Sequence, residues 1–255
     1  MNLTLEKGLN VLECLAFRAE PMTLSEITEE VGGNKSTIFR MLETLRKYGY
    51  VEQETHRGRY RAGLKVLRLS TNILHRMELL NKAGPYMHTL GDETGCDIYL
   101  AADSNGRAIQ ISAYFPGGRR RTDLGSTGNE NKFWYTAMGK CIASFQSPEI
   151  INKLFSHTAV VKKTPHTITD RNEILAQFEE IRNSGIAYTR YENSEQIFGI
   201  AVPVRNFEGE VIAAIGLAVN KSRIEKEGEE RFAEKLKEYG EQLSFALGYA
   251  SEKLI

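Results

Sequence analysis

A short segment near the N-terminus constrains the fold of this chain more than any other. Thr23 and Glu26 stand three residues apart and predict a capping box, which begins a helix. Gly32 and Gly33 then predict a tight turn, because glycine reaches positive φ without strain. Asn34 is a favourable N-cap for a second helix. The order of these signals indicates a helix-turn-helix.

A small β-hairpin is expected directly after the second helix. Apolar and polar residues alternate over residues 50–53 and 59–62 well enough to predict two short paired strands. The tip between them, His56-Arg57-Gly58, is basic. A helix-turn-helix followed by a basic hairpin predicts a winged helix-turn-helix, and such a tip can lie along a nucleic-acid backbone.

The second helix of this motif begins with basic and small polar side chains. The first turn of a recognition helix enters the major groove, where Lys and Arg reach guanine or phosphate and Ser and Thr accept or donate hydrogen bonds. We therefore expect double-stranded DNA to be bound by Ser25, Asn34, Lys35, Ser36, Thr37, Arg40, His56, Arg57 and Arg59. A winged helix that serves only as a protein-interaction module is the alternative, and the basic tip argues against it.

The charge distribution agrees with a DNA-binding N-terminal part. The whole chain has a formal net charge of zero, which argues against non-specific binding to nucleic acid. Residues 34–76, however, carry ten Lys and Arg side chains against three Glu, whereas residues 1–33 carry two against six. The positive excess therefore coincides with the predicted recognition helix and hairpin.

Composition excludes several classes of protein. A chain of 255 residues with 41% hydrophobic and 26% charged residues is typical of two globular domains. It contains no apolar stretch of the ~18 residues needed to span a bilayer, so we expect no membrane partner and a cytoplasmic protein. The three cysteines, Cys14, Cys96 and Cys141, lie far apart without a CxxC motif, which predicts neither disulfides nor a metal site. No cofactor is expected.

Helical periodicity and chain breaks predict the rest of the N-terminal half. A first helix of about three turns is predicted from apolar residues that recur at helical spacing, namely Leu5, Leu9, Leu12, Leu15 and Ala16. A further amphipathic helix over residues 64–77 is interpreted as a rigid connector. Gly84-Pro85 is expected to break the chain, so the domain boundary is placed near residues 77–84.

The remaining residues mix helical and strand periodicity. Helices are expected over residues 85–94, 136–145, 148–155 and 169–183, followed by a last long helix capped by Ser222 and Glu225. Strands are expected over residues 97–102, 108–114, 197–204 and 211–219, and a long loop over residues 116–131. Antiparallel strand pairs flanked by helices predict an α+β domain.

Taken in order, these motifs resemble the IclR family of transcriptional regulators. The N-terminal part of the resemblance covers residues 24–27, 34–45, 49–50 and 60–63. The C-terminal part covers residues 136–140, 181–185, 192–193, 200–204, Gly209, residues 211–216 and Arg223. A helix-turn-helix alone is a weak signal, but both parts in order and at the family's spacing make a specific one.

The resemblance implies a fold and a function. It implies a winged helix-turn-helix over residues 1–63, a linker helix over 64–80 and a GAF-like α/β effector-binding domain over 81–255. It further implies a sequence-specific regulator, expected to be a repressor and not an enzyme, whose operator affinity a small organic ligand controls. Homodimers or homotetramers on palindromic operators are implied as well, since two-fold symmetry lets two recognition helices read half-sites roughly 34 Å apart.

The resemblance also implies an effector pocket at the start of the helix predicted over 136–145. Its candidate residues are Trp134, Ala137, Met138, Gly139, Thr189, Glu192, Gly199, Gly216 and Ala218. A helix N-terminus suits a carboxylate, so we expect a carboxylate, a sugar acid or an aromatic catabolite. Trp134 would supply an aromatic wall, although it and Met138 are as readily interpreted as core residues.

Two further features have competing interpretations. Cys141 lies near the same helix start, which can lower a thiol's pKa, so a thiol-based redox sensor or enzyme is the alternative function. Arg119, Arg120 and Arg121 form a basic run in the predicted long loop, where they could meet an anionic ligand, DNA, another subunit or only solvent.

Overall fold

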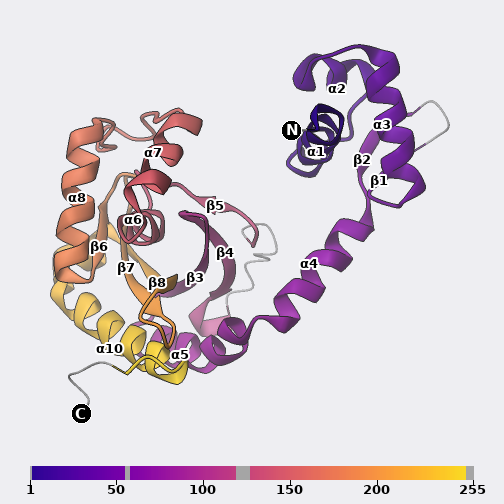
Figure 1. Cartoon of the computed structure of the whole chain (residues 1–255). Helices are drawn as coiled ribbons and strands as arrows, with labels where there is room; N and C mark the ends of the chain where they lie inside the picture. The colour runs from indigo at the N-terminus through magenta and orange to yellow at the C-terminus, as the bar shows by residue number, and fades with distance from the viewer. Residues whose placement is uncertain (1, 55–57, 119–126, 251–255) are drawn as a thin grey trace. The chain divides into compact units, whose positions relative to one another are not determined.

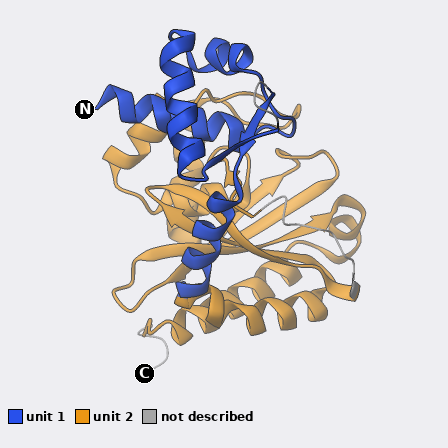
Figure 2. Ribbon diagram, turned by 90° about the vertical axis from the view of Figure 1, so that its right-hand side faces the viewer, with its two compact units in different colours: residues 1–77 blue, residues 78–255 orange. Residues whose placement is uncertain are grey.

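The computed structural model describes residues 2–54, 58–118 and 127–250 of the chain. The chain divides into two compact units, residues 1–77 and 78–255 (Figure 2). The predicted domain limits, with a separate linker helix, stay a prediction. No helix among the described residues is long and apolar enough to cross a membrane.

The first unit is the predicted winged helix-turn-helix followed by one more helix (Figure 1). Its elements are α1 (Leu3–Ala16), α2 (Leu24–Val31), α3 (Lys35–Lys47), β1 (Val51–Gln53), β2 (Tyr60–Ala62) and α4 (Leu64–Arg76). The capping box of Thr23 and Glu26 is present, and the Asn34 side chain accepts a hydrogen bond from the Thr37 amide. Both helices of the motif therefore begin where the sequence predicts.

A small apolar core holds the three helices and the hairpin together. Val11, Ile27, Ile38 and Leu42 are completely buried in it. Of the apolar residues that predict α1, Leu15 is buried, whereas Leu5 and Leu9 are exposed, and the helix also buries Val11. Both faces of α1 carry apolar residues, so periodicity alone could not choose between them.

The break predicted at Gly84-Pro85 is wrong. Helix α5 (Glu78–Thr94) runs through both residues without interruption. Gly84 has no Cβ to meet the proline ring, which removes part of the penalty for a proline inside a helix. Burial of Ala83, Met87 and Leu90 stabilises the continuous helix.

The second unit is built on one antiparallel sheet of six strands. The strands are β3 (Asp97–Ser104), β4 (Arg107–Tyr114), β5 (Glu130–Asn131), β6 (Ala187–Arg190), β7 (Ile197–Arg205) and β8 (Val211–Asn220), in the spatial order β5-β4-β3-β8-β7-β6. The four strands that the sequence predicts form its centre. The sequence missed the edge strands β5 and β6, which are too short to give a clear periodic signal.

Helices cover both faces of this sheet and complete the α+β fold that the sequence predicts (Figure 1). Helix α10 (Glu230–Ala246) packs on one face beside α5, and α6 (Ala137–Ser144) packs on the other beside α8 (Arg171–Ser184). The remaining helices are η1 (Pro116–Gly118), α7 (Pro148–His157) and α9 (Lys221–Glu227).

The last long helix of the sequence prediction is in fact two helices. Gly228, with φ of 80°, ends α9 before α10 begins. The predicted cap of Ser222 and Glu225 is also wrong, since Asn220 is the N-cap residue of α9. Glycine at positive φ allows the chain to turn between the two helices, so the apolar stripe of α10 can meet the sheet.

Candidate effector cavity and DNA-binding face

The start of α3 presents a polar and basic surface. Ile38, Met41 and Leu42 are buried on one side of the helix, which directs Lys35, Ser36 and Arg40 to solvent on the other. Four of the predicted DNA-binding residues, Lys35, Ser36, Thr37 and Arg40, therefore belong to the first two turns of α3. Asn34, the N-cap, accepts hydrogen bonds from the Thr37 amide and the Ser36 hydroxyl.

The hairpin is joined to the start of α2. Tyr60 of β2 forms an isolated bridge with Met22, and the Arg59 guanidinium donates a 2.9 Å hydrogen bond to the Pro21 carbonyl. Arg59 also lies 3.5 Å from the Glu26 carboxylate. Arg59 therefore holds the hairpin against α2. Ser25 is exposed in the first turn of α2, and His56 and Arg57 lie outside the described residues.

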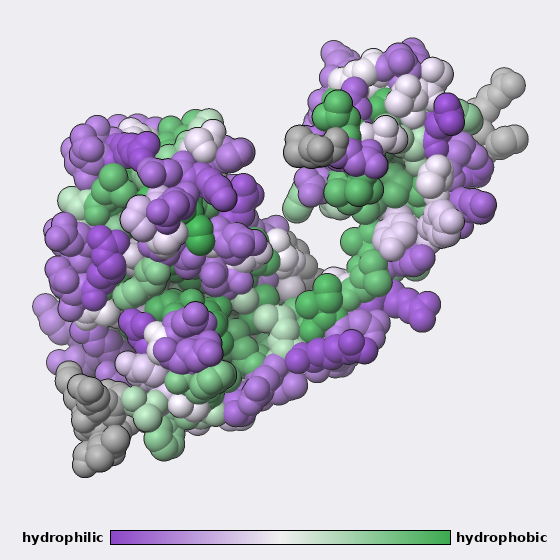
Figure 3. Space-filling model, viewed as in Figure 1, coloured by the Kyte–Doolittle hydropathy of each residue, from purple (hydrophilic) through white to green (hydrophobic). Residues whose placement is uncertain are grey.

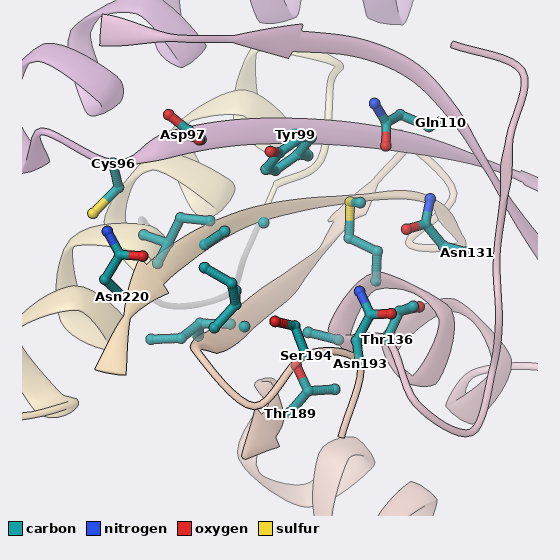
Figure 4. A pocket seen from close by; sticks show the side chains of 18 of the residues that line it. Cys96, Asp97, Tyr99, Gln110, Asn131, Thr136, Thr189, Asn193, Ser194 and Asn220 are labelled. Carbon is teal, nitrogen blue, oxygen red and sulfur yellow. The ribbon is translucent and has the colours of Figure 1, made fainter. Parts of the chain in front are cut away.

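The second unit contains a cavity of about 430 Å³ between the sheet and the start of α6 (Figure 4). Each of the six strands contributes at least one residue to its lining. The cavity is lined by six of the residues predicted for the effector pocket, namely Ala137, Met138, Thr189, Gly199, Gly216 and Ala218. Residues more than fifty positions apart in the sequence are thus brought to one cavity.

The N-terminus of α6 supplies the polar character of the cavity floor. The Thr136 side chain caps this helix by accepting a 3.1 Å hydrogen bond from the Gly139 amide. The N–H groups of Ala137 and Met138 have no acceptor within the helix, because the first turn lacks preceding carbonyls. Their alignment with the helix dipole favours an anionic group at this point.

Two family models match the chain. One, described as the IclR helix-turn-helix domain, matches residues 4–55. The other, described as bacterial transcriptional regulator IclR C-terminal, matches residues 71–245. The chain belongs to the IclR family. It is therefore a transcriptional regulator with a DNA-binding helix-turn-helix and an effector-binding C-terminal domain.

Individual IclR-family relatives agree with this assignment. An uncharacterized HTH-type transcriptional regulator of Haemophilus influenzae is 30% identical over 251 residues, which cover 97% of this chain and 94% of that protein. The DNA-binding transcriptional repressor YiaJ of Escherichia coli is 29% identical over 248 residues, which cover 96% and 88%. The crystal structure of an IclR regulator from a Silicibacter species has a TM-score of 0.83 over 97% of both chains at 24% identity, which shows the shared fold.

Glycines keep space open on the sheet side of this IclR-family cavity. A Cβ on Gly199 would collide with the Thr189 hydroxyl, and one on Gly216 would lie 2.8 Å from the Ile200 carbonyl and 3.1 Å from Met138 Cγ. Thr189 and Met138 can therefore approach the strands closely. Any larger residue at either glycine would have to displace its neighbours or reduce the cavity.

Three predicted pocket residues lie away from the cavity wall, which corrects their expected placement. Trp134 is buried in the apolar core and donates a 2.9 Å hydrogen bond to the Val161 carbonyl. Gly139 packs against the backbone before α6. Glu192 is buried in an ion pair with Lys140. Tertiary packing places Trp134 in the core and Glu192 against Lys140, and the sequence pattern does not encode that packing.

The thiol alternative has no geometric support. Cys141 is completely buried in α6, and burial raises the pKa of its thiol far above the ordinary value. A thiol that stays protonated is a poor nucleophile and a poor redox sensor. The basic run Arg119 to Arg121 lies outside the described residues.

Several cavity residues were missed by the sequence analysis. The polar ones that matter most for recognition are Gln110, Asn131, Asn193, Ser194, Asn220 and Arg223. Gln110 could have been found, because it is a polar residue inside the apolar run of β4. Asn193 and Ser194 carry no such signal, since polar residues in a loop are ordinarily solvated.

Proposed function

We propose that this IclR-family chain is a repressor of transcription that binds a palindromic operator, and that a small organic acid in the cavity at α6 controls its operator affinity. One observation carries the proposal. A cavity of about 430 Å³, a size typical of small-molecule sites, combines a helix N-terminus with amide and hydroxyl side chains. The protein would act in the cytoplasm, where bacterial DNA is found, and we infer no catalytic role.

A sugar acid fits this cavity better than an aromatic catabolite. The carboxylate would accept hydrogen bonds from the N–H groups at the start of α6. The hydroxyl groups would face polar side chains such as Asn131, Asn193 and Ser194, which Figure 4 shows around the cavity. An aromatic ligand would lose the wall that Trp134 was expected to supply, because this residue belongs to the core.

The DNA-binding role of the α3 surface follows from its chemistry. Lys35 and Arg40 can reach guanine or phosphate, and Ser36 and Thr37 can bind phosphate oxygens. Phe39, which the sequence analysis left out of the site, is 44% exposed on the same helix. An exposed aromatic side chain there could contact a thymine methyl group.

Helix α4 supports a dimer. None of its thirteen residues, all within the described part of the chain, is buried. The apolar side chains of Leu67 and Ile73 are 60% and 63% exposed. Figure 3 shows hydrophobic residues along one edge of this helix and hydrophilic residues along the other. Exposed apolar surface of this kind marks a protein interface, and a second copy would supply the two-fold symmetry that a palindrome requires.

Adding charge to this surface should weaken the dimer. The double substitution Leu67→Lys/Ile73→Lys is expected to lower the molar mass measured by light scattering, because it places charges at the proposed interface. The substitution Asn72→Lys/His75→Lys, which adds two charges on the opposite side of the same helix, is the matched control and should keep the mass of the wild type. An unchanged mass for the first variant would place the interface elsewhere.

A sugar acid should also stabilise the protein. At about 100 times its dissociation constant a ligand adds about 2.7 kcal/mol to the free energy of unfolding. For a unit of this size that corresponds to a rise in Tm of roughly 5–10 °C. D-Gluconate, D-galacturonate, D-glycerate, pyruvate and benzoate, each tested by thermal shift, sample the relevant chemical classes.

D-Sorbitol is the matched control for D-gluconate, because it keeps the open chain and its hydroxyl groups and carries a neutral CH2OH group in place of the carboxylate. An active acid should also change the amount of operator fragment that the protein shifts in a gel. Stabilisation by D-sorbitol and the acids alike would argue against a carboxylate site at α6. If a whole panel of sugar acids and organic acids left both Tm and operator binding unchanged, the proposed control by ligand would be wrong.

A further inference from the structure

The second unit contains a buried ion pair behind the effector cavity. Lys140 of α6 donates a hydrogen bond through Nζ to the Glu192 carboxylate, and the two side chains are 1% and 6% exposed. Lys140 Nζ also lies 3.5 Å from the Tyr188 carbonyl of β6. Burial lowers the pKa of the Lys140 amine, and the neighbouring carboxylate opposes that shift. A buried pair is not in itself stabilising relative to apolar side chains, so its position deserves a specific explanation.

The chain around Glu192 has an unfavourable backbone conformation that its neighbours hold in place. Tyr191 has φ of 68°, which few non-glycine residues adopt. The hydroxyl of Thr164 donates a 2.9 Å hydrogen bond to the Tyr191 carbonyl, and that of Thr167 donates a 2.8 Å bond to the Glu192 carbonyl. Both threonines are buried. Side-chain and backbone contacts together therefore fix this turn.

The next two residues belong to the cavity wall. Asn193 and Ser194 line the cavity, and Figure 4 shows both on the same side of it as Thr136 at the start of α6. Lys140 lies one helical turn after Thr136 on the same helix. The ion pair thus connects the helix that forms the cavity floor to the loop that forms its rim.

We propose that Lys140 and Glu192 are positioning residues of the effector site, which hold the Asn193–Ser194 rim against α6 so that the cavity is formed before a ligand arrives. A preformed rim lowers the ordering cost of binding, because its side chains are already fixed. The importance of the cavity for regulation rests on the proposed function, whereas the state of the rim can be measured without any ligand.

The test uses the full chain with the double substitution Lys140→Met/Glu192→Leu, which removes both charges and nearly keeps the volume. Trypsin can cut after Arg190, directly before the turn, and after Arg182 in α8. We expect cleavage after Arg190 to be at least about tenfold faster than in the wild type, because the rim opens locally, with cleavage after Arg182 unchanged. Mass spectrometry of the timed digest identifies each cut.

Two further variants keep the test decisive. Lys235→Met/Glu93→Leu removes an ion pair between α10 and α5 and should leave cleavage after Arg190 unchanged. Glu192→Asp keeps the charge but shortens the side chain, so it should increase that cleavage to a smaller extent. If the double variant does not fold, the Glu192→Asp variant decides by the same measurement.

Two results would overturn the proposal. One is an unchanged rate of cleavage after Arg190 in a folded double variant. The other is an equal increase in the rates of cleavage after Arg182 and Arg190, which would mean that the pair contributes only global stability. Binding of D-gluconate, measured by thermal shift, is a separate arm in which the double variant should bind at least about tenfold more weakly than the wild type. Absence of D-gluconate binding by the wild type would count against the proposed ligand class and leave the cleavage result to decide on the pair.

Discussion

Replacing both Lys35 and Arg40 with alanine is expected to reduce operator affinity by roughly 30-fold or more, since each base or phosphate contact of this kind contributes about 1–3 kcal/mol. Both side chains are exposed at the start of α3, so the substitution should leave the fold intact. A gel-shift titration against the DNA upstream of the protein's own gene, at two salt concentrations, measures the loss. The salt dependence of binding should also decrease, because fewer counterions are released.

Arg46→Ala is the matched control for this experiment. Arg46 lies in the last turn of the same helix, where it forms a 2.7 Å ion pair with Glu43. Removing it changes the net charge without touching the start of α3, so operator affinity should change by less than about threefold. Equal binding by the wild type and the Lys35→Ala/Arg40→Ala variant would show that another surface contacts DNA.

The substitution Gly139→Ala is expected to destabilise the second unit by about 3 kcal/mol, which corresponds to a decrease in Tm of roughly 6–12 °C. A Cβ at this position would lie within 3.0 Å of the backbone carbonyl oxygens of Asn131 and Lys132. These atoms belong to the main chain before α6 and cannot move aside as a flexible side chain would. Thermal unfolding of the purified variant, followed by circular dichroism, measures the effect.

Gly8→Ala provides a comparison in which the same change should be harmless. Apart from the adjacent residues and the backbone of α1 itself, no atom lies within 4 Å of a Cβ built on Gly8, and alanine favours a helix interior by about 0.5–1 kcal/mol relative to glycine. Its Tm should stay the same or rise. A Gly139→Ala variant as stable as the wild type would mean that α6 can shift away from residues 131–132, and the cavity floor would then be less rigid than its packing indicates.

Features with local signals were predicted correctly from the sequence. The capping box at Thr23 and the N-cap at Asn34 each depend on residues within one helical turn. The four central strands and their hairpin turns also follow from alternation and turn residues. Six cavity residues were found as well, although through the family resemblance and not through periodicity.

The errors occurred where a local pattern has more than one solution. Gly84-Pro85 can end a helix or lie inside one, and burial of α5 against the sheet decides for the second. Helix α1 has apolar residues on two faces, so only its contacts with α2 and α3 decide that Val11 is buried and that Leu5 and Leu9 are exposed. The roles of Glu192 and Trp134 likewise depend on their partners, Lys140 and the Val161 carbonyl. Each partner is distant in sequence, so no local pattern predicts the contact.

The sequence by itself determined the helix-turn-helix, the basic start of α3 and the four central strands, because caps, turns and periodicity are short-range effects. Only the tertiary structure decided which side chains face the cavity. It brought the start of α6, the rim after β6 and the glycines of β7 and β8 together, and it buried Lys140 against Glu192 behind them. The physical reason is that burial and ion pairing depend on neighbours that come together only when the chain packs.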